Sequence, residues 1–126
     1  MNKILIIDDE AGFTRLMKLT LQQTGDYEVF EENDGAHAWE TARRVQPDLI
    51  LLDIVMPKMD GGDVADRIRK DAELVHIPIV FLSAIVSDKD EIPGGLIGGF
   101  PYLSKPVSLD ALIQGIHDNL PTSAQP

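Results

Sequence analysis

Four consecutive large aliphatic residues, Leu49 to Leu52, end abruptly at a carboxylate, Asp53. An uninterrupted apolar run of this length between polar ends is typical of a strand buried on both faces, at the centre of a parallel sheet. Open α/β sheets place their ligand sites beyond the carboxyl ends of such strands. The pattern therefore predicts either a functional site at Asp53 or, equally from this stretch alone, a buried strand that ends in a loop aspartate.

Similar apolar runs alternate along the chain with segments of helical periodicity. Alternating strands and helices predict an α/β fold, a doubly wound parallel sheet with right-handed crossovers and helices on both faces. The expected strands are Ile4–Ile7, Tyr27–Glu31, Leu49–Leu52, Ile77–Leu82 and Tyr102–Leu103. The expected helices run from about Phe13 to Gly25, Gly35 to Gln46, Gly62 to Asp71 and Ser108 to Leu120.

One expected helix has an unsuitable sequence. Residues 87–99 contain Pro93 and four glycines, which are the least favourable residues in a helix interior. This segment is therefore expected to form a short or irregular fourth helix, whose order changes when the protein is activated.

Composition narrows the classes of function. The chain has 126 residues, as expected for one domain, and a net charge of −10, which argues against nucleic-acid binding. It has no cysteine, which excludes disulfides and thiolate metal sites. The first apolar run has only four residues, too short for a signal peptide or a membrane span, so we expect a cytoplasmic protein that does not bind membranes.

Four of the five expected strands end beside residues with useful chemistry. Asp8 and Asp9 follow the first strand, Asp53 the third, Ser83 the fourth and Lys105 the fifth. Each of these alone is more often a capping, loop or solvated residue. Because the carboxyl ends of parallel strands share one edge of a sheet, all five residues are expected to converge there.

The residue types indicate phosphoryl transfer. Three carboxylates in close proximity repel one another and favour a hard divalent cation such as Mg²⁺. Lys105 adds a positive charge and Ser83 a hydroxyl donor. A metal, a lysine and a hydroxyl around one carboxylate describe an aspartate nucleophile, for which Asp53 is the best candidate.

The chain resembles the response regulator receiver domains of two-component signalling over essentially its whole length. The resemblance rests on Asp8-Asp9, Asp53 with Met56-Pro57 and Asp60-Gly61, Ser83-Ala84, and Tyr102-Leu103-Ser104-Lys105-Pro106. It implies the flavodoxin-like fold with strand order 2-1-3-4-5. It also implies a phosphorylation-activated switch, which receives a phosphoryl group from a histidine kinase or a phosphotransfer protein.

The resemblance also assigns roles in the metal site. Asp53 would hold the phosphoryl group as an acyl phosphate. Asp9, Asp53 and the backbone carbonyl of Val55 would bind Mg²⁺ directly, and Asp8 would act through a water molecule.

Other roles implied by the resemblance concern the phosphoryl group and the response to it. Ser83 and Lys105 would bind the phosphoryl oxygens, and Ser83 and Tyr102 would form the conformational switch. The signal would pass to a downstream protein through residues 87–105 and the last helix.

Two departures from the family pattern have consequences. Gly62 stands where receivers usually have an apolar residue, which is expected to weaken the start of the third helix. Val55 and Ile85 stand two residues beyond Asp53 and Ser83, where many receivers carry polar side chains that influence hydrolysis. We therefore expect slow autodephosphorylation and no other enzymatic activity.

The expected domain covers residues 1–120, and residues 121–126 are expected to be a flexible C-terminal tail. Two other classes of function are weighed against the switch. One is a receiver-like interaction module that works without phosphorylation, although degenerate receivers typically lose the acids, Ser83 and Lys105 that this chain keeps. The other is a metal-dependent phosphohydrolase, which would be expected to have a second acid where this chain has Val55.

Overall fold

The computed structural model describes residues 1–56, 59–83, 96–97, 100–104 and 108–120, which form one α/β unit. Its main sheet has the order β2-β1-β3-β6-β8-β7, and its first five strands are parallel. This confirms the predicted parallel sheet, because these five strands follow the order 2-1-3-4-5 along the chain. The strands of this sheet are β1 (Asn2–Ile7), β2 (Tyr27–Glu32), β3 (Leu49–Asp53), β6 (Ile79–Ser83), β7 (Leu96–Ile97) and β8 (Phe100–Ser104).

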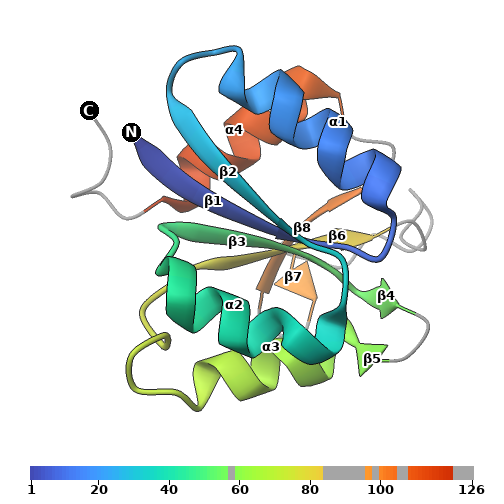
Figure 1. Ribbon diagram of the computed structural model, residues 1–126, viewed down its shortest axis with the longest axis vertical. Helices are drawn as coiled ribbons and strands as arrows, with labels where there is room; N and C mark the ends of the chain where they lie inside the picture. The colour runs from blue at the N-terminus through green and yellow to red at the C-terminus, as the bar shows by residue number, and fades with distance from the viewer. Residues whose placement is uncertain (57–58, 84–95, 98–99, 105–107, 121–126) are drawn as a thin grey trace.

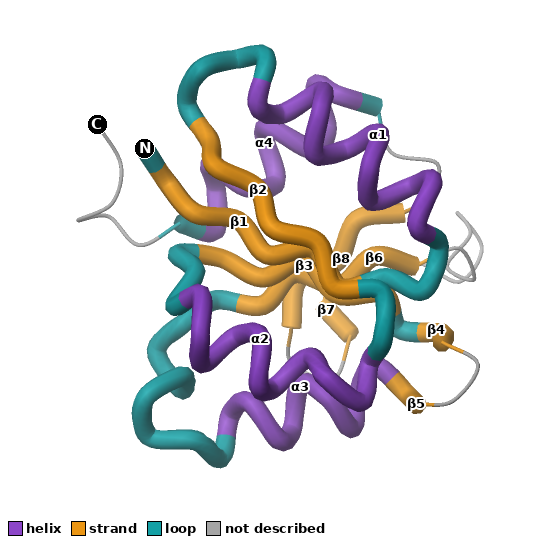
Figure 2. The backbone as a smooth tube through the Cα atoms, in the orientation of Figure 1, coloured by secondary structure: helices purple, strands orange, loops and turns teal. Residues whose placement is uncertain are grey.

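Helices cover both faces of the sheet (Figure 1). Helices α1 (Ala11–Gln22) and α4 (Leu109–Asn119) lie on one face. Helices α2 (Ala38–Val45) and α3 (Gly61–Arg69) lie on the other, and a short 3-10 turn, η1 (Gly35–His37), precedes α2. The same three layers can be followed in the backbone tube (Figure 2).

Alternation along the central strands divides the core into two halves. Leu5 and Ile50 pack towards α2 and α3, whereas Ile4 and Leu49 pack towards α1 and α4. All five residues of β3 are buried, because both neighbouring strands and both helical layers cover it. The continuous apolar sequence of this strand is thereby explained.

The region of the expected fourth helix differs from the prediction at two residues. Leu96 and Ile97 form β7, which pairs antiparallel with Phe100 and Pro101 of β8. The rest of 87–99 lies outside the described residues, as does the expected tail over 121–126.

A second small ribbon follows β3 and was not predicted. Strands β4 (Val55–Met56) and β5 (Met59–Asp60) pair antiparallel immediately before α3. Helix α3 begins at Gly61, one residue earlier than expected, since the Asp60 side chain accepts a hydrogen bond from the Gly62 N–H at 2.7 Å and caps the first turn.

Candidate metal and phosphoryl site

Three carboxylates meet at the carboxyl ends of the two central strands. Ile7 pairs with Leu52 in the sheet, so Asp8 and Asp53, the next residues along β1 and β3, are level with each other. One carboxylate oxygen from each of Asp8, Asp9 and Asp53 lies within 4.8 Å of the other two. The sequence prediction that these acids converge is therefore confirmed.

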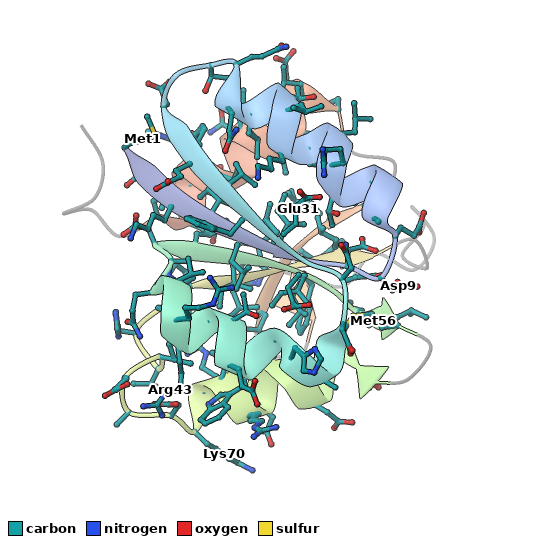
Figure 3. The ribbon with its side chains drawn as sticks, in the orientation of Figure 1. Met1, Asp9, Glu31, Arg43, Met56 and Lys70 are labelled. Carbon is teal, nitrogen blue, oxygen red and sulfur yellow. The ribbon has the colours of Figure 1, made fainter. Side chains whose placement is uncertain are left out.

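The three acids differ in exposure. Asp8 is fully buried and Asp53 is only 5% exposed, whereas Asp9 is exposed. Backbone N–H groups donate to the buried pair: Glu10 N to Asp8 Oδ1 at 3.0 Å, and Val55 N to Asp53 Oδ1 at 3.2 Å. Figure 3 shows Asp9 near Met56, beside the small ribbon β4–β5.

The loop after β3 is held by close packing. The Gly61 N–H donates to the Ile54 carbonyl at 2.8 Å. A Cβ atom placed on Gly61 would lie 2.3 Å from the Asp53 carbonyl oxygen and 2.7 Å from Ile54 Cα. Only glycine allows α3 to start this close to Asp53, which explains why glycine follows Asp60 in the sequence.

The donor set fits a hard divalent cation. All three side chains offer oxygen ligands, and two of them are carboxylates buried from solvent, where negative charge is costly without a counter-charge. Bound Mg²⁺ would be held by these acids and would supply positive charge for phosphoryl oxygens. Thiolate and imidazole ligands are absent from this group, which distinguishes it from the usual zinc sites.

The remaining predicted site residues are described to different extents. Val55, the expected carbonyl ligand, is 56% exposed and lies in β4. Ser83 is the last residue of β6 and pairs with Ser104, but its side chain lies outside the description, as do Lys105 and Ile85. Tyr102 lies in β8, partly buried against the core half that faces α2 and α3.

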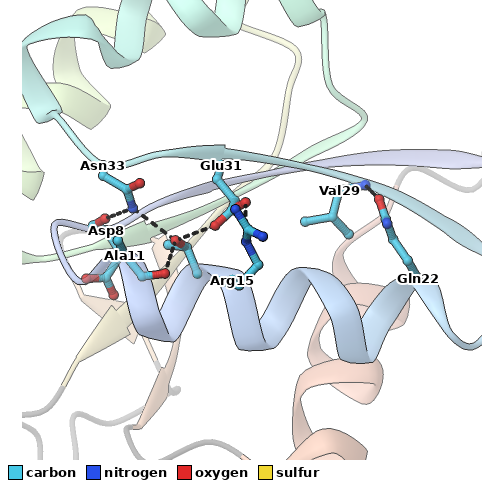
Figure 4. Close-up of polar contacts among 8 residues, drawn as sticks. Asp8, Ala11, Arg15, Gln22, Val29, Glu31 and Asn33 are labelled. Carbon is cyan, nitrogen blue, oxygen red and sulfur yellow. Dashed lines mark hydrogen bonds and ion pairs between the residues drawn. The ribbon is translucent and has the colours of Figure 1, made fainter.

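A polar network behind the Asp8 turn was missed in the sequence analysis (Figure 4). Asn33 Nδ2 donates to the Asp8 carbonyl oxygen at 2.8 Å and to Thr14 Oγ1 at 2.9 Å. The Thr14 hydroxyl is fully buried and lies 2.8 Å from Glu31 Oε1, which it can reach as a donor. A polar residue on the buried face of the first helix was the signal that could have revealed this network.

A different acidic cluster lies beyond the other end of α3. Asp71 Oδ2 accepts hydrogen bonds from Trp39 Nε1 at 2.9 Å and Arg43 Nη1 at 3.1 Å, and Asp71 Oδ1 accepts from Glu73 N. The Glu73 N–H, followed by Trp39 and Arg43, lowers the pKa of Asp71 below its usual 3.8 despite opposing desolvation. Arg43 and Arg67 also stack over the Trp39 ring, so this cluster links α2 to α3 and the loop that follows it.

Comparison with known families agrees with this geometry. The response regulator receiver domain matches residues 4–117. The chain belongs to this family. Receiver domains act as signalling switches rather than as conventional enzymes, and the acidic group described above lies where such domains typically bind Mg²⁺.

Curated relatives of this receiver domain are longer proteins. It is 34% identical to the DNA-binding dual master transcriptional regulator RpaA of Synechocystis, over 99% of this chain and 54% of that protein. It is 36% identical to the alkaline phosphatase synthesis transcriptional regulatory protein PhoP of Bacillus subtilis, over 84% of this chain and 43% of that protein. The chain thus spans about half the length of the curated relatives it matches.

Solved structures of receivers superpose on more than nine-tenths of the chain. The chemotaxis protein CheY4 of Vibrio cholerae has a TM-score of 0.82 and 29% identity, covering 95% of this chain and 99% of that one. The BeF3-activated receiver domain of RstA from Klebsiella pneumoniae has a TM-score of 0.78 and 30% identity, covering 94% and 97%. Within the described part of the chain, the helices are too short or too polar to cross a membrane.

Proposed function

We propose that this receiver domain, residues 1–120, is a phosphorylation-activated switch in which Asp53 accepts a phosphoryl group from a histidine kinase or phosphotransfer protein. The observation that carries the proposal is the meeting of Asp53 with Asp8 and Asp9, with ligand oxygens within 4.8 Å of one another. Asp53 is the member of this group that ends the central strand β3, and membership of the receiver family supports the same assignment.

In the proposed reaction, a carboxylate oxygen of Asp53 attacks the phosphorus of a phosphohistidine. The new P–O bond forms as the P–N bond breaks, and the electron pair of that bond returns to the imidazole nitrogen. The Val55 N–H donates to Asp53 Oδ1 at 3.2 Å and orients the carboxylate. Ser83 and Lys105 are proposed to bind the phosphoryl oxygens, where charge accumulates during transfer.

Cation binding is proposed to involve Asp9, Asp53 and the Val55 carbonyl directly, and Asp8 through water. Asp8 and Asp53 form the buried side of this site, whereas Asp9 is exposed on the side that faces solvent. Bound Mg²⁺ would offset the mutual repulsion of the acids and the charge of the phosphoryl group.

The output is proposed to be a conformational change that starts at Ser83 and Tyr102 and is recognised by a protein partner. The strands that carry these residues are adjacent, because β6 pairs with β8 in parallel register. The net charge of −10 over the whole chain favours a protein rather than nucleic acid as its partner.

The test is incubation with acetyl phosphate and Mg²⁺, followed by intact mass measurement. Wild type is expected to gain the mass of one phosphoryl group, and chelation of Mg²⁺ with EDTA is expected to prevent the gain. Asp53→Asn should remain unmodified, while Asp71→Asn, which changes a carboxylate far from the site, should be modified normally. Failure of wild type to gain mass would instead favour an interaction module that works without phosphorylation.

A further inference from the structure

The turn that carries the two N-terminal acids of the site joins α1 through backbone hydrogen bonds, because Phe13 N and Thr14 N both donate to the Glu10 carbonyl at 3.1 Å. Glu10 occupies the N-cap position of α1 without a capping hydrogen bond from its side chain. Asp9 is exposed, and within the described part of the chain its carboxylate has no hydrogen bond or ion pair. The position of the Asp9 carboxylate is therefore determined by the backbone of residues 8–10.

That backbone is held from the end of β2. The Asp8 N–H donates to the Glu32 carbonyl at 3.1 Å, which extends the β1–β2 pairing by one bond. On its other side, the Asp8 carbonyl accepts a hydrogen bond from Asn33 Nδ2 at 2.8 Å. A carbonyl oxygen can only accept, so the amide of Asn33 must present its nitrogen here.

The second hydrogen of that amide is also used. Asn33 Nδ2 donates to Thr14 Oγ1 at 2.9 Å, and the single hydroxyl hydrogen of Thr14 can be given to Glu31 Oε1 at 2.8 Å or to Ala11 O at 3.1 Å. Glu31 is fixed in turn by an ion pair with Arg15 at 3.5 Å. The orientation of Asn33 is thus determined by a buried hydroxyl on α1 (Figure 4).

We infer that Asn33 and Thr14 are positioning residues for cation binding: together they fix the Asp8 turn so that Asp9 reaches the oxygen cluster with Asp53. The inference rests on the proposed function, because it concerns the affinity of the same site for Mg²⁺. Neither side chain belongs to the ligand group, so the effect acts through the backbone of Asp8. Residues that orient metal ligands in this way typically affect metal affinity by 10- to 100-fold.

Calorimetric titration of MgCl₂ into the metal-free protein tests the inference. Asn33→Ala is expected to weaken Mg²⁺ binding about tenfold, at the lower end of that range because Asn33 contacts a ligand residue through its backbone. Thr14→Val, which keeps the shape but removes the hydroxyl, is expected to weaken it about fivefold, as for one ordinary hydrogen bond. The double variant should resemble Asn33→Ala alone, since the two changes interrupt one network.

Thr41→Val is the matched control. Thr41 is similarly buried, and its hydroxyl bonds the side chain of Glu32 at Oε1, at 2.5 Å. Among the residues that the structure describes, it contacts neither Asn33 nor Asp8 by hydrogen bonding, and the Glu32 group that accepts from Asp8 is the backbone carbonyl, which the substitution leaves in place. The control is expected to bind Mg²⁺ within about twofold of wild type. Melting curves without Mg²⁺ separate the two effects, because a purely structural role would change the melting temperature and leave the Mg²⁺ affinity of the folded protein unchanged.

Equal Mg²⁺ affinity of Asn33→Ala and wild type would overturn the inference and leave the proposed function intact. An equal loss of affinity in Thr41→Val would overturn it as well, because any buried hydroxyl near β2 would then suffice. Absence of Mg²⁺ binding by wild type would overturn both proposals. Should Thr14→Val fail to fold by circular dichroism, Asn33→Ala decides the question, since the Asn33 side chain lies at an exposed position.

Discussion

The two acidic groups at opposite ends of α3 have different surroundings. At the end near Gly61, three carboxylates of the site face one another within 4.8 Å. Beyond Arg69, the single carboxylate of Asp71 is surrounded by donors from Trp39, Arg43 and Glu73. Figure 3 shows the labelled Asp9 and Arg43 far apart in the molecule.

The two groups differ in their expected effect on stability: Asp71 stabilises the folded protein, whereas the three acids of the candidate metal site are expected to destabilise it until a cation binds. The charge of Asp71 is offset by its neighbours in the folded protein, so its ionised form favours folding. The carboxylates of Asp8, Asp9 and Asp53 lie within 4.8 Å of one another, so their repulsion is expected to oppose folding, and a bound cation would relieve it.

The largest effect is expected from Gly61→Ala. The added methyl group would overlap the Asp53 carbonyl oxygen at 2.3 Å and Ile54 Cα at 2.7 Å, both of them backbone atoms. Overpacking of this kind should lower the free energy of unfolding by about 3 kcal/mol and shift the metal site. Urea denaturation measures the loss, and the response of the melting temperature to Mg²⁺ measures the shift.

Gly62→Ala is the control for this substitution. Its Cβ would lie 3.1 Å from Asp60 Oδ1, a side-chain atom that can move, and alanine favours helix more than glycine does. Unfolding free energy should stay equal or rise by up to about 1 kcal/mol. Equal destabilisation by both substitutions would show that the cost comes from replacing glycine in the first turn of α3. It would then not come from overlap with the backbone of Asp53.

Mg²⁺ should stabilise the folded protein. At a concentration of 100 times Kd, linkage predicts about 2.7 kcal/mol in favour of the folded state. Asp9→Ala should reduce this gain, because it removes one ligand and part of the repulsion, whereas Asp71→Asn should keep it. Thermal melts of the three proteins across a Mg²⁺ series test the distinction; a flat wild-type series would argue against a metal site.

A smaller effect is expected from acid titration of Asp71. Because the folded-state pKa of Asp71 is lowered, its ionised form contributes stability above the ordinary pKa of 3.8, and this is lost as pH falls through the lower folded value. Asp71→Asn should therefore be less stable than wild type at neutral pH, and the difference should shrink in acid. Denaturation curves at several pH values measure the difference in unfolding free energy between the two proteins. A difference that grows as pH falls would contradict a lowered pKa of Asp71 in the folded state.

The sequence was most informative where periodicity and strand ends determine the structure. The apolar runs ending at Ile7 and Leu52 predicted that Asp8 and Asp53 lie at one edge of the sheet, because parallel strands share a carboxyl edge. The register of β1 and β3, which places the two acids level with each other, is seen only in the structure. The role of Gly61 could not be predicted, since it depends on the distance between α3 and the backbone of β3. The pairing of Leu96 and Ile97 with β8 could not be predicted from periodicity, because a strand of two residues is too short to show an alternating pattern.

Side-chain networks were the least predictable part of the site. Thr14 is a polar residue on the buried face of α1, which indicates a polar contact, but the sequence does not indicate its partners, Glu31 in β2 and Asn33 just after that strand. The same applies to the bonds from Trp39 and Arg43 to Asp71, whose residues lie about thirty positions apart. Hydrogen bonds between such distant residues follow from the fold and have no periodic pattern in the sequence.

The most direct test of the account is to locate the phosphoryl group after reaction with acetyl phosphate and Mg²⁺. Borohydride reduces an aspartyl phosphate to homoserine, and peptide mass spectrometry then identifies the modified position. Homoserine is expected at position 53 in wild type and is expected to be absent in Asp53→Asn. Homoserine at position 8 or 9, or at none of the three acids despite a gain in intact mass, would contradict Asp53 as the phosphoryl acceptor.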